Sequence, residues 1–183
     1  MGIKKGIELA RKHNRVDRNN RERHFAGMTH AEIRSILKAN GLNPHMEIWF
    51  DSTEVAIITP EGILLQMRPA DNGKLGLWGG ILKNNKEGAG YGAIRKVYEE
   101  TGLILTISDL TPDEFHSHSH RYANGDKAFF YTNRFIVRMD SVPAIIFDEA
   151  DTTAVVLINA DNIDDYEIID DQLPFIRRLL NID

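Results

Sequence analysis

Acidic and basic side chains between residues 87 and 100 have the types and the spacing needed to hold a cation. Seven residues separate Glu87 from Arg95, and Glu99 and Glu100 follow one helical turn later. On a helix, the arginine and both glutamates fall on one ionic side. Two adjacent carboxylates suit Mg²⁺, which takes oxygen ligands from carboxylates, phosphate and water. The pattern therefore indicates a magnesium site, and the alternative is a solvated helix face.

Glycines lie on both sides of this charged segment. A glycine-rich loop is expected over residues 71–80, and it ends in Trp78-Gly79-Gly80. A helix is expected over roughly 88–101, with an apolar side opposite the ionic one. Gly102 stands where that helix should end, because glycine adopts a left-handed C-terminal conformation at little cost.

These residues together resemble the signature of the Nudix hydrolase family. The signature is a Gly, five residues, a Glu, seven residues, and then Arg-Glu-aliphatic-any-Glu-Glu-any-Gly-aliphatic. The matching positions, all in register, are Glu87, Arg95, Val97, Glu99, Glu100, Gly102 and Leu103. Two positions differ: six residues separate Gly80 from Glu87, and Lys96 stands where the family has a glutamate. The resemblance covers about residues 50–180.

The resemblance implies an α/β fold, namely a Nudix-like α/β/α sandwich with a mixed sheet, over residues 46–183. It also implies hydrolysis of a phosphoanhydride bond in a nucleoside diphosphate derivative, with Mg²⁺ or Mn²⁺ as cofactor. Because Lys96 replaces an acidic residue, a second hypothesis stays open. It is a catalytically weak Nudix fold that serves nucleotide sensing or regulation.

The resemblance also assigns roles to individual residues. Glu99 and Glu100 are expected as metal ligands, together with the carbonyl of Gly80, and Glu100 belongs to the catalytic set. Glu87 and Arg95 are expected to pair and to hold the loop against the helix. A glutamate from a late loop often acts as base or metal ligand in the family, and Glu149 fits that position best. An acidic surface loop is the alternative for Glu149.

Other side chains are candidates for substrate contact. Arg68, at a strand end beside the glycine loop, could bind phosphate or be a surface charge. Trp78 and Tyr122 could stack on a nucleobase or pack in the core. His116, His118 and His120 alternate along an expected strand and so face one side. They could bind a transition metal, contact substrate (His118 above all), or lie on a solvated sheet face.

The remaining pattern predicts the elements that position these residues. Apolar, β-branched runs at 54–59 and 62–67 flank Pro60-Glu61 and read as a hairpin. Further strands are expected near 103–108, 115–122, 127–139 and 153–159. Residues 173–180 have the pattern of an amphipathic helix with a proline in its first turn.

Residues 1–45 differ in charge from the rest of the chain. They carry 10 Lys/Arg against 4 Asp/Glu, a net of +6, whereas residues 46–183 carry 12 against 23, a net of −11. A helical, basic N-terminal extension over 1–45 is expected, with Thr29 and Glu32 as a capping pair for a helix that ends near Asn40-Gly41. A solvated face or an intersubunit contact, as in a homodimer, is favoured over nucleic-acid binding, because aromatic residues are not interleaved with the basic ones.

Composition excludes several classes of protein. The chain has no cysteine, so disulfides, thiolate metal sites and cysteine nucleophiles are ruled out. No apolar run approaches the ~18 residues of a membrane span. The amino terminus lacks the core of a signal peptide. A cytoplasmic protein without a membrane partner is therefore expected, and the family resemblance implies a small nucleotide as its substrate.

Overall fold

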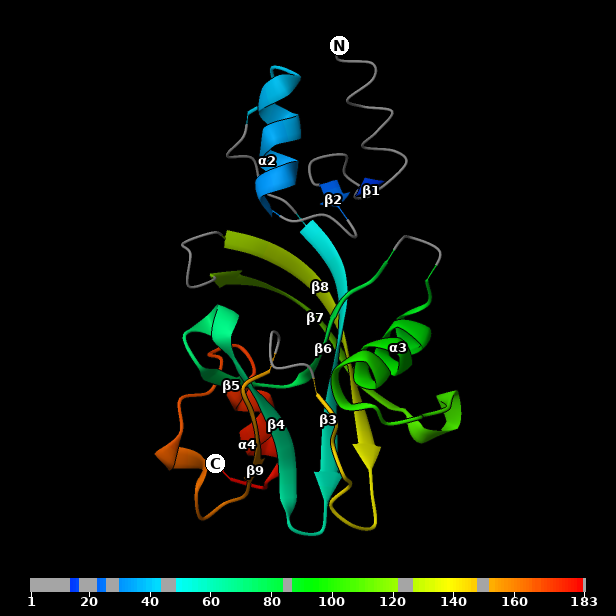
Figure 1. The fold of residues 1–183 in the computed structure, drawn as a ribbon, viewed down its shortest axis with the longest axis vertical. Helices are drawn as coiled ribbons and strands as arrows, with labels where there is room; N and C mark the ends of the chain where they lie inside the picture. The colour runs from blue at the N-terminus through cyan, green and yellow to red at the C-terminus, as the bar shows by residue number, and fades with distance from the viewer. Residues whose placement is uncertain are drawn as a thin grey trace.

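A seven-stranded mixed sheet forms the centre of the computed structural model, which describes residues 14–16, 23–25, 30–43, 49–83, 87–121, 127–147 and 152–182. Its main path runs β5-β4-β3-β8-β7, with β6 paired to β3 and β9 paired to β4 (Figure 1). β3 and β8 run parallel, whereas the other pairs are antiparallel. The strands are β3 (Trp49–Thr59), β4 (Gly62–Arg68), β5 (Lys74–Gly76), β6 (Trp78–Ile81), β7 (Thr111–Arg121), β8 (Lys127–Arg138) and β9 (Ala154–Ile158).

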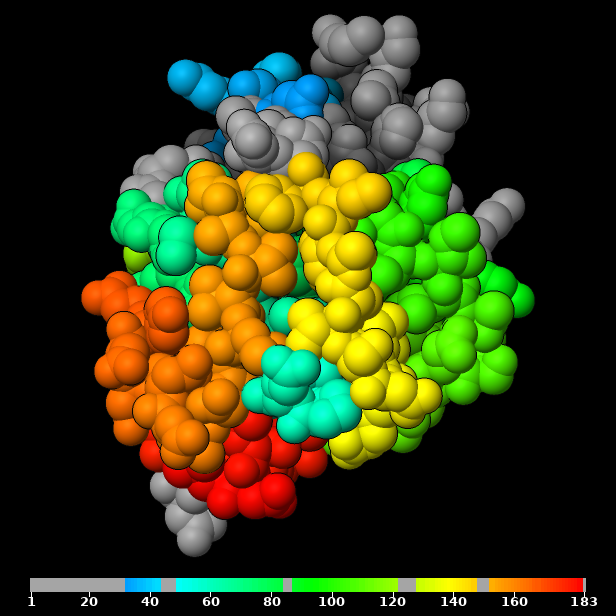
Figure 2. Space-filling model, turned by 60° about the horizontal axis from the view of Figure 1, so that its bottom comes forward, coloured from blue at the N-terminus to red at the C-terminus, as the bar shows by residue number. Residues whose placement is uncertain are grey.

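Alternating residues of β3 pack against helices on opposite faces of the sheet. Val55 and Ile57 belong to the core that includes Ala93 and Val97 of α3 (Ala89–Thr101). Ala56 belongs to the core formed with α4 (Leu173–Leu179). Figure 2 shows the turn between β3 and β4 with the α3 side (green) and α4 (red) on different flanks. The expected α/β/α sandwich with a mixed sheet is confirmed.

Several expected elements are confirmed with small changes in their bounds. The β3–β4 hairpin turns at Pro60-Glu61, where the Thr59 hydroxyl donates to the Gly62 carbonyl. α3 ends at Gly102, whose φ of 72° is left-handed and whose N–H donates to the Tyr98 carbonyl. The strands expected near 115–122, 127–139 and 153–159 correspond to β7, β8 and β9.

Two expectations for the domain were wrong. Residues 103–108 do not form a strand, because Thr106 and Asp109 cap each other and start a short 3-10 helix (Ile107–Asp109). The loop expected over 71–80 contains a 3-10 turn (Pro69–Asp71) and the strands β5 and β6. Their backbone groups pair with β4 and β3, a long-range pairing that local sequence does not reveal.

The N-terminal region differs in part from the expected helical extension. α2 (His30–Ala39) confirms the second helix, with Ile33 and Leu37 buried against Phe50 and Phe130. β1 (Asn14–Val16) and β2 (Arg23–Phe25) instead form an antiparallel pair where a helix was expected. The helix was expected because Arg11, Arg15 and Arg18 continue the helical spacing of Ile3, Ile7 and Ala10, but charged residues at this spacing do not exclude paired strands. The boundary at residue 45 stays a prediction.

Among the helices that the structure describes, none has the length and apolar character that a membrane crossing requires.

Candidate functional site

A bidentate ion pair ties the segment before α3 to the helix. Arg95 Nε donates to Glu87 Oε1 at 2.7 Å, and Arg95 Nη2 donates to Glu87 Oε2 at 2.9 Å. Glu87 also accepts a hydrogen bond from the Lys83 amide, and Arg95 donates to the Ile81 carbonyl. The hydrogen bond from Arg95 outweighs burial and lowers the pKa of Glu87. Both groups stay charged, and the pair fixes the loop on the helix.

Glu99 lies among three cations. Arg95 Nη1 donates to Glu99 Oε2 at 2.9 Å, and Lys83 Nζ lies 3.4 Å from Oε1. Lys96 Nζ lies 3.7 Å from Glu99 Oε2. Burial would raise the pKa of Glu99, but the charges of Arg95 and Lys96 outweigh it, and the pKa is lowered.

Glu100 fastens α3 to the sheet. Its Oε2 accepts hydrogen bonds from the Gly79 amide at 2.9 Å and from Gln66 Nε2 at 3.2 Å. Its Oε1 lies 2.7 Å from Lys96 Nζ. The contact needs a glycine at 79, because φ is 144° and a Cβ would lie 2.1 Å from the Thr53 carbonyl oxygen. β6 therefore lies close against β3, and the Gly79 amide of β6 points at the Glu100 carboxylate.

The donor types around Glu99 and Glu100 fit a hard divalent cation, with one competitor. Carboxylate and carbonyl oxygens are the ligands that Mg²⁺ prefers. The Lys96 ammonium lies on the same two carboxylates, and its stem passes Gly80, where a Cβ would lie 2.9 Å from Lys96 Cε. Three carboxylates near the start and on the ionic side of α3 are thus matched by three cations. The carboxylates are Glu87, Glu99 and Glu100, and the cations are Lys83, Arg95 and Lys96. A divalent metal must displace Lys96 to use both glutamates.

A cleft opens at the same glycines that contact Glu100 and Lys96. The open space of this cleft, counted out to solvent, is about 490 Å³. The residues that line it include Arg68, Gly79, Gly80, His118, His120 and Asp171.

Histidines of β7 form one wall of this cleft. His118 Nδ1 lies 2.9 Å from Asp171 Oδ2, and its Nε2 lies 3.0 Å from the Thr132 hydroxyl. His120 hydrogen-bonds to Asp71, which also pairs with Arg68 at 3.0 Å. Burial opposes ionisation of Asp71, but these partners outweigh it and lower the pKa of that carboxyl.

His116 lies next to His118, and its surroundings disfavour a positive charge on its ring. Burial, followed by the nearby charges of Arg134 and His118, lowers the pKa of His116. Its ring therefore favours the neutral form at neutral pH.

Comparison with known proteins was made at the level of sequence and of structure. No family model and no curated protein matches the sequence. A bifunctional NMN adenylyltransferase/ADP ribose pyrophosphatase from Francisella tularensis is similar over 83% of this chain and 45% of its own, with TM-score 0.60 and 22% identity. The Nudix domain of NrtR from Shewanella oneidensis, complexed with ADP ribose, is similar over 84% and 98%, with TM-score 0.60 and 20% identity.

A third structure is the E. coli dihydroneopterin triphosphate pyrophosphohydrolase, similar over 72% of this chain and 94% of its own, with TM-score 0.58 and 17% identity. The chain has the Nudix fold. It spans less than half of the Francisella protein, so the similarity concerns one part of that protein.

Trp78, which the sequence suggested for substrate binding, lies in the core instead. Trp78 is fully buried, and its Nε1 donates to the Leu64 carbonyl at 2.8 Å. It packs in the core under α3 and cannot stack on a ligand, so its assignment to substrate binding was wrong. Arg68 and His118 do line the cleft, whereas Tyr122 and Glu149 lie outside the described residues.

Sequence reasoning missed a buried polar network behind the cleft. Arg134 Nε donates to Glu54 Oε2 at 2.6 Å, and Gln172 Nε2 donates to Glu54 Oε1 at 2.7 Å. The Gln172 side-chain oxygen accepts the Leu77 amide. Charged residues inside apolar strands, as at 54 and 134, were the available signal, but their partners come from distant segments.

We expect Arg95→Met to lower the free energy of unfolding by roughly 2 kcal/mol, because Glu87 and Glu99 lose a charged, part-buried partner. Arg138→Met removes the same charge from an exposed site on β8 and should change stability little. Urea unfolding of the two variants and the wild type measures the difference. Equal loss of stability in both variants would contradict the role of the pair.

Proposed function

We propose that this chain is a metal-dependent hydrolase of a phosphoanhydride bond in a nucleoside diphosphate derivative. The observation that carries the proposal is the position of the α3 carboxylates directly behind the Gly79–Gly80 edge of the cleft. Two neighbours support the ligand class: one was solved with ADP ribose, and the Francisella protein was solved with AMP and a Mn ion.

Each part of the site has a role in this proposal. A divalent cation, Mg²⁺ or Mn²⁺, would be held by Glu99 and Glu100 with the Gly80 carbonyl, and it would neutralise phosphate charge and orient the attacking water. Arg95 holds Glu87 and Glu99 in place through the contacts described above. Glu149 is proposed as the base from its sequence position alone.

The cleft would orient the rest of the ligand. Arg68 offers a guanidinium for a phosphate oxygen, although it must share that group with Asp71. His118 and His120 are held by carboxylates and present ring edges toward the same space. Positioning of this kind accounts for much of catalysis in phosphoryl transfer.

Replacement of Glu99 tests the metal site, because among the described residues Glu99 contacts the side chains of Lys83, Arg95 and Lys96. Glu100, in contrast, also accepts hydrogen bonds from the Gly79 amide and the Gln66 side chain, which fasten α3 to the sheet. We expect Glu99→Gln to lower Mg²⁺-dependent turnover of ADP-ribose-type substrates by at least about 100-fold. Steady-state kinetics over a Mg²⁺ series, beside a thermal melt, measure both effects.

Glu61→Gln is the matched control, since it removes one carboxylate from an exposed turn. It should keep wild-type turnover. A well-folded Glu99→Gln variant with unchanged turnover would exclude Glu99 as a metal ligand.

The contact between Lys96 and Glu100 favours a second candidate function. An ammonium 2.7 Å from a carboxylate supplies the positive charge that a metal would otherwise bring. A protein with such a resident cation can keep its cleft and bind a nucleotide without hydrolysing it. This candidate is a sensing or regulatory module with weak or no turnover.

Lys96→Glu separates the two candidates. The Coulomb energy of unit charges at ~4 Å is roughly 4 kcal/mol at an effective dielectric near 20, so loss of the ammonium should strengthen metal binding clearly. For the hydrolase, we expect the Mg²⁺ concentration for half-maximal turnover to fall by at least about tenfold. For the sensing module, turnover should be absent in the wild type and present in the variant.

Lys38→Glu provides the control, because it makes the same charge change on an exposed face of α2. Calorimetric Mg²⁺ titration and kinetics on the three proteins decide the matter. Lower turnover with a raised Michaelis constant would instead place Lys96 on the substrate.

A further inference from the structure

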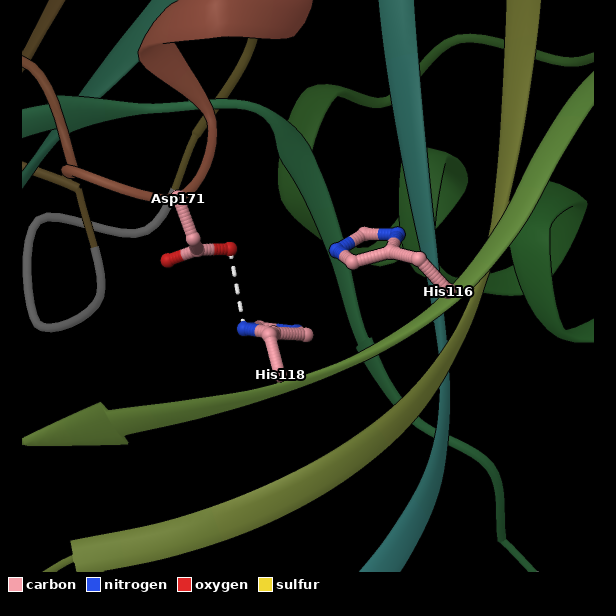
Figure 3. Close-up of side chains that lie close together, drawn as sticks. All are labelled: His116, His118 and Asp171. Atoms are coloured by element: carbon pink, nitrogen blue, oxygen red, sulfur yellow. Dashed lines mark ion pairs between the residues drawn. The ribbon is translucent and has the colours of Figure 1, made fainter.

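Three side chains from two distant segments meet beside the cleft, and two of them, His116 and Asp171, have no role in the proposed hydrolysis. His116 and His118 come from β7, and Asp171 comes from the residues just before α4 (Figure 3). One potential ligand atom from each residue lies within 4.8 Å of the other two. The two imidazole rings are stacked, with centroids 4.8 Å apart.

His116 is the member of this cluster that lacks hydrogen-bond partners. Both of its ring nitrogens are buried and make no hydrogen bond to the described residues, and the nearest carboxylate oxygen, of Glu114, lies 4.0 Å from Nδ1. His118 Nδ1 and Asp171 Oδ2 face each other as an ion pair at 2.9 Å. Buried polar atoms without partners are rare and commonly mark an ion or water site.

The neighbours of the cluster would hold the ligands in a suitable form. His118 Nε2 lies 3.0 Å from the Thr132 hydroxyl, which in turn lies 2.7 Å from the Ser52 hydroxyl. A metal-binding histidine usually donates its second ring N–H to such a partner, which fixes the ring and leaves the first nitrogen free. Here Nδ1 would be the free atom, and it faces Asp171.

The local charge also favours a dication. Arg134 lies 3.5 Å from Asp171 Oδ2, but it is held at 2.6 Å by Glu54 and at 2.6 Å by Glu114. Glu114 also lies 3.7 Å from Arg178, which pairs with Asp113. Four carboxylates and two guanidinium groups thus leave a net negative charge around this part-buried cluster, which favours a bound cation.

We propose that His116, His118 and Asp171 bind one transition-metal ion of the zinc class. Two imidazoles and one carboxylate are a donor set for Zn²⁺ or Fe²⁺, whereas Mg²⁺ prefers oxygen alone. Ligand atoms of a tetrahedral zinc lie roughly 3.3 Å apart, so small side-chain rotations close the cluster. His118 and Asp171 line the cleft, and the open coordination positions would face its contents.

The site is chemically distinct from the α3 carboxylates. Two of its three donors are nitrogen atoms, and the cluster lies beside the cleft, whereas α3 packs on the other face of the sheet. The alternation of β7 first suggested three histidine ligands, but His120 is held by Asp71 instead. Asp171 takes the third place.

Calorimetric titration of untagged, chelator-treated full-length protein with Zn²⁺ tests the proposal. We expect one zinc per chain, retained in excess Mg²⁺ and in Glu99→Gln. His116→Ala and Asp171→Asn should each weaken zinc binding by at least about tenfold. His120→Gln is the matched control on the same strand face and should bind zinc as the wild type does.

A thermal melt gives a second readout that also reports folding of each variant. Zinc should raise the melting temperature of the wild type and of His120→Gln, and should leave that of His116→Ala unchanged. Absence of binding and of a thermal shift in the wild type would overturn the proposal. Loss of zinc binding in His120→Gln together with unchanged binding in Asp171→Asn would contradict the assigned ligand set. Zinc binding is also measured in Glu99→Gln, which lacks one ligand of the proposed α3 metal site. Failure of the zinc proposal is therefore distinguishable from failure of the proposed function.

Discussion

The carboxylates on and beside α3 need positive or hydrogen-bonding partners, and this requirement determines how α3 packs on the sheet. Glu100 is nearly buried, so its charge requires partners, and these come from β6, β4 and the next turn back along α3. Those contacts fix the helix on the sheet and place the glutamates at the edge of the cleft. The same contacts create a competition between Lys96 and a metal, because Lys96 contacts the oxygens of Glu99 and Glu100 that a divalent metal would use.

The two proposed metal sites lie on opposite faces of the sheet. The oxygen donors belong to α3, whereas the imidazole donors belong to β7, where His118 lines the cleft. Gln172, just before α4, joins segments that line the cleft, because its side chain accepts a hydrogen bond from the Leu77 amide and donates one to Glu54 of β3.

Local signals and the family resemblance predicted most of the framework. The hairpin at Pro60-Glu61, the helix that ends at Gly102 and the Glu87–Arg95 pair depend on residues close in sequence. What sequence could not predict depends on long-range packing. β5 and β6 form only because β4 and β3 offer paired edges, Trp78 is buried by α3, and Asp171 meets His116 through the position of α4.

The most direct test of the central claim is the anomalous-scattering map of crystals grown with Mn²⁺ and ADP ribose. The account predicts a manganese peak coordinated by Glu99 and Glu100, with the Lys96 ammonium withdrawn from Glu100. A map in which Lys96 still lies on Glu100 and manganese is absent from α3 would contradict it.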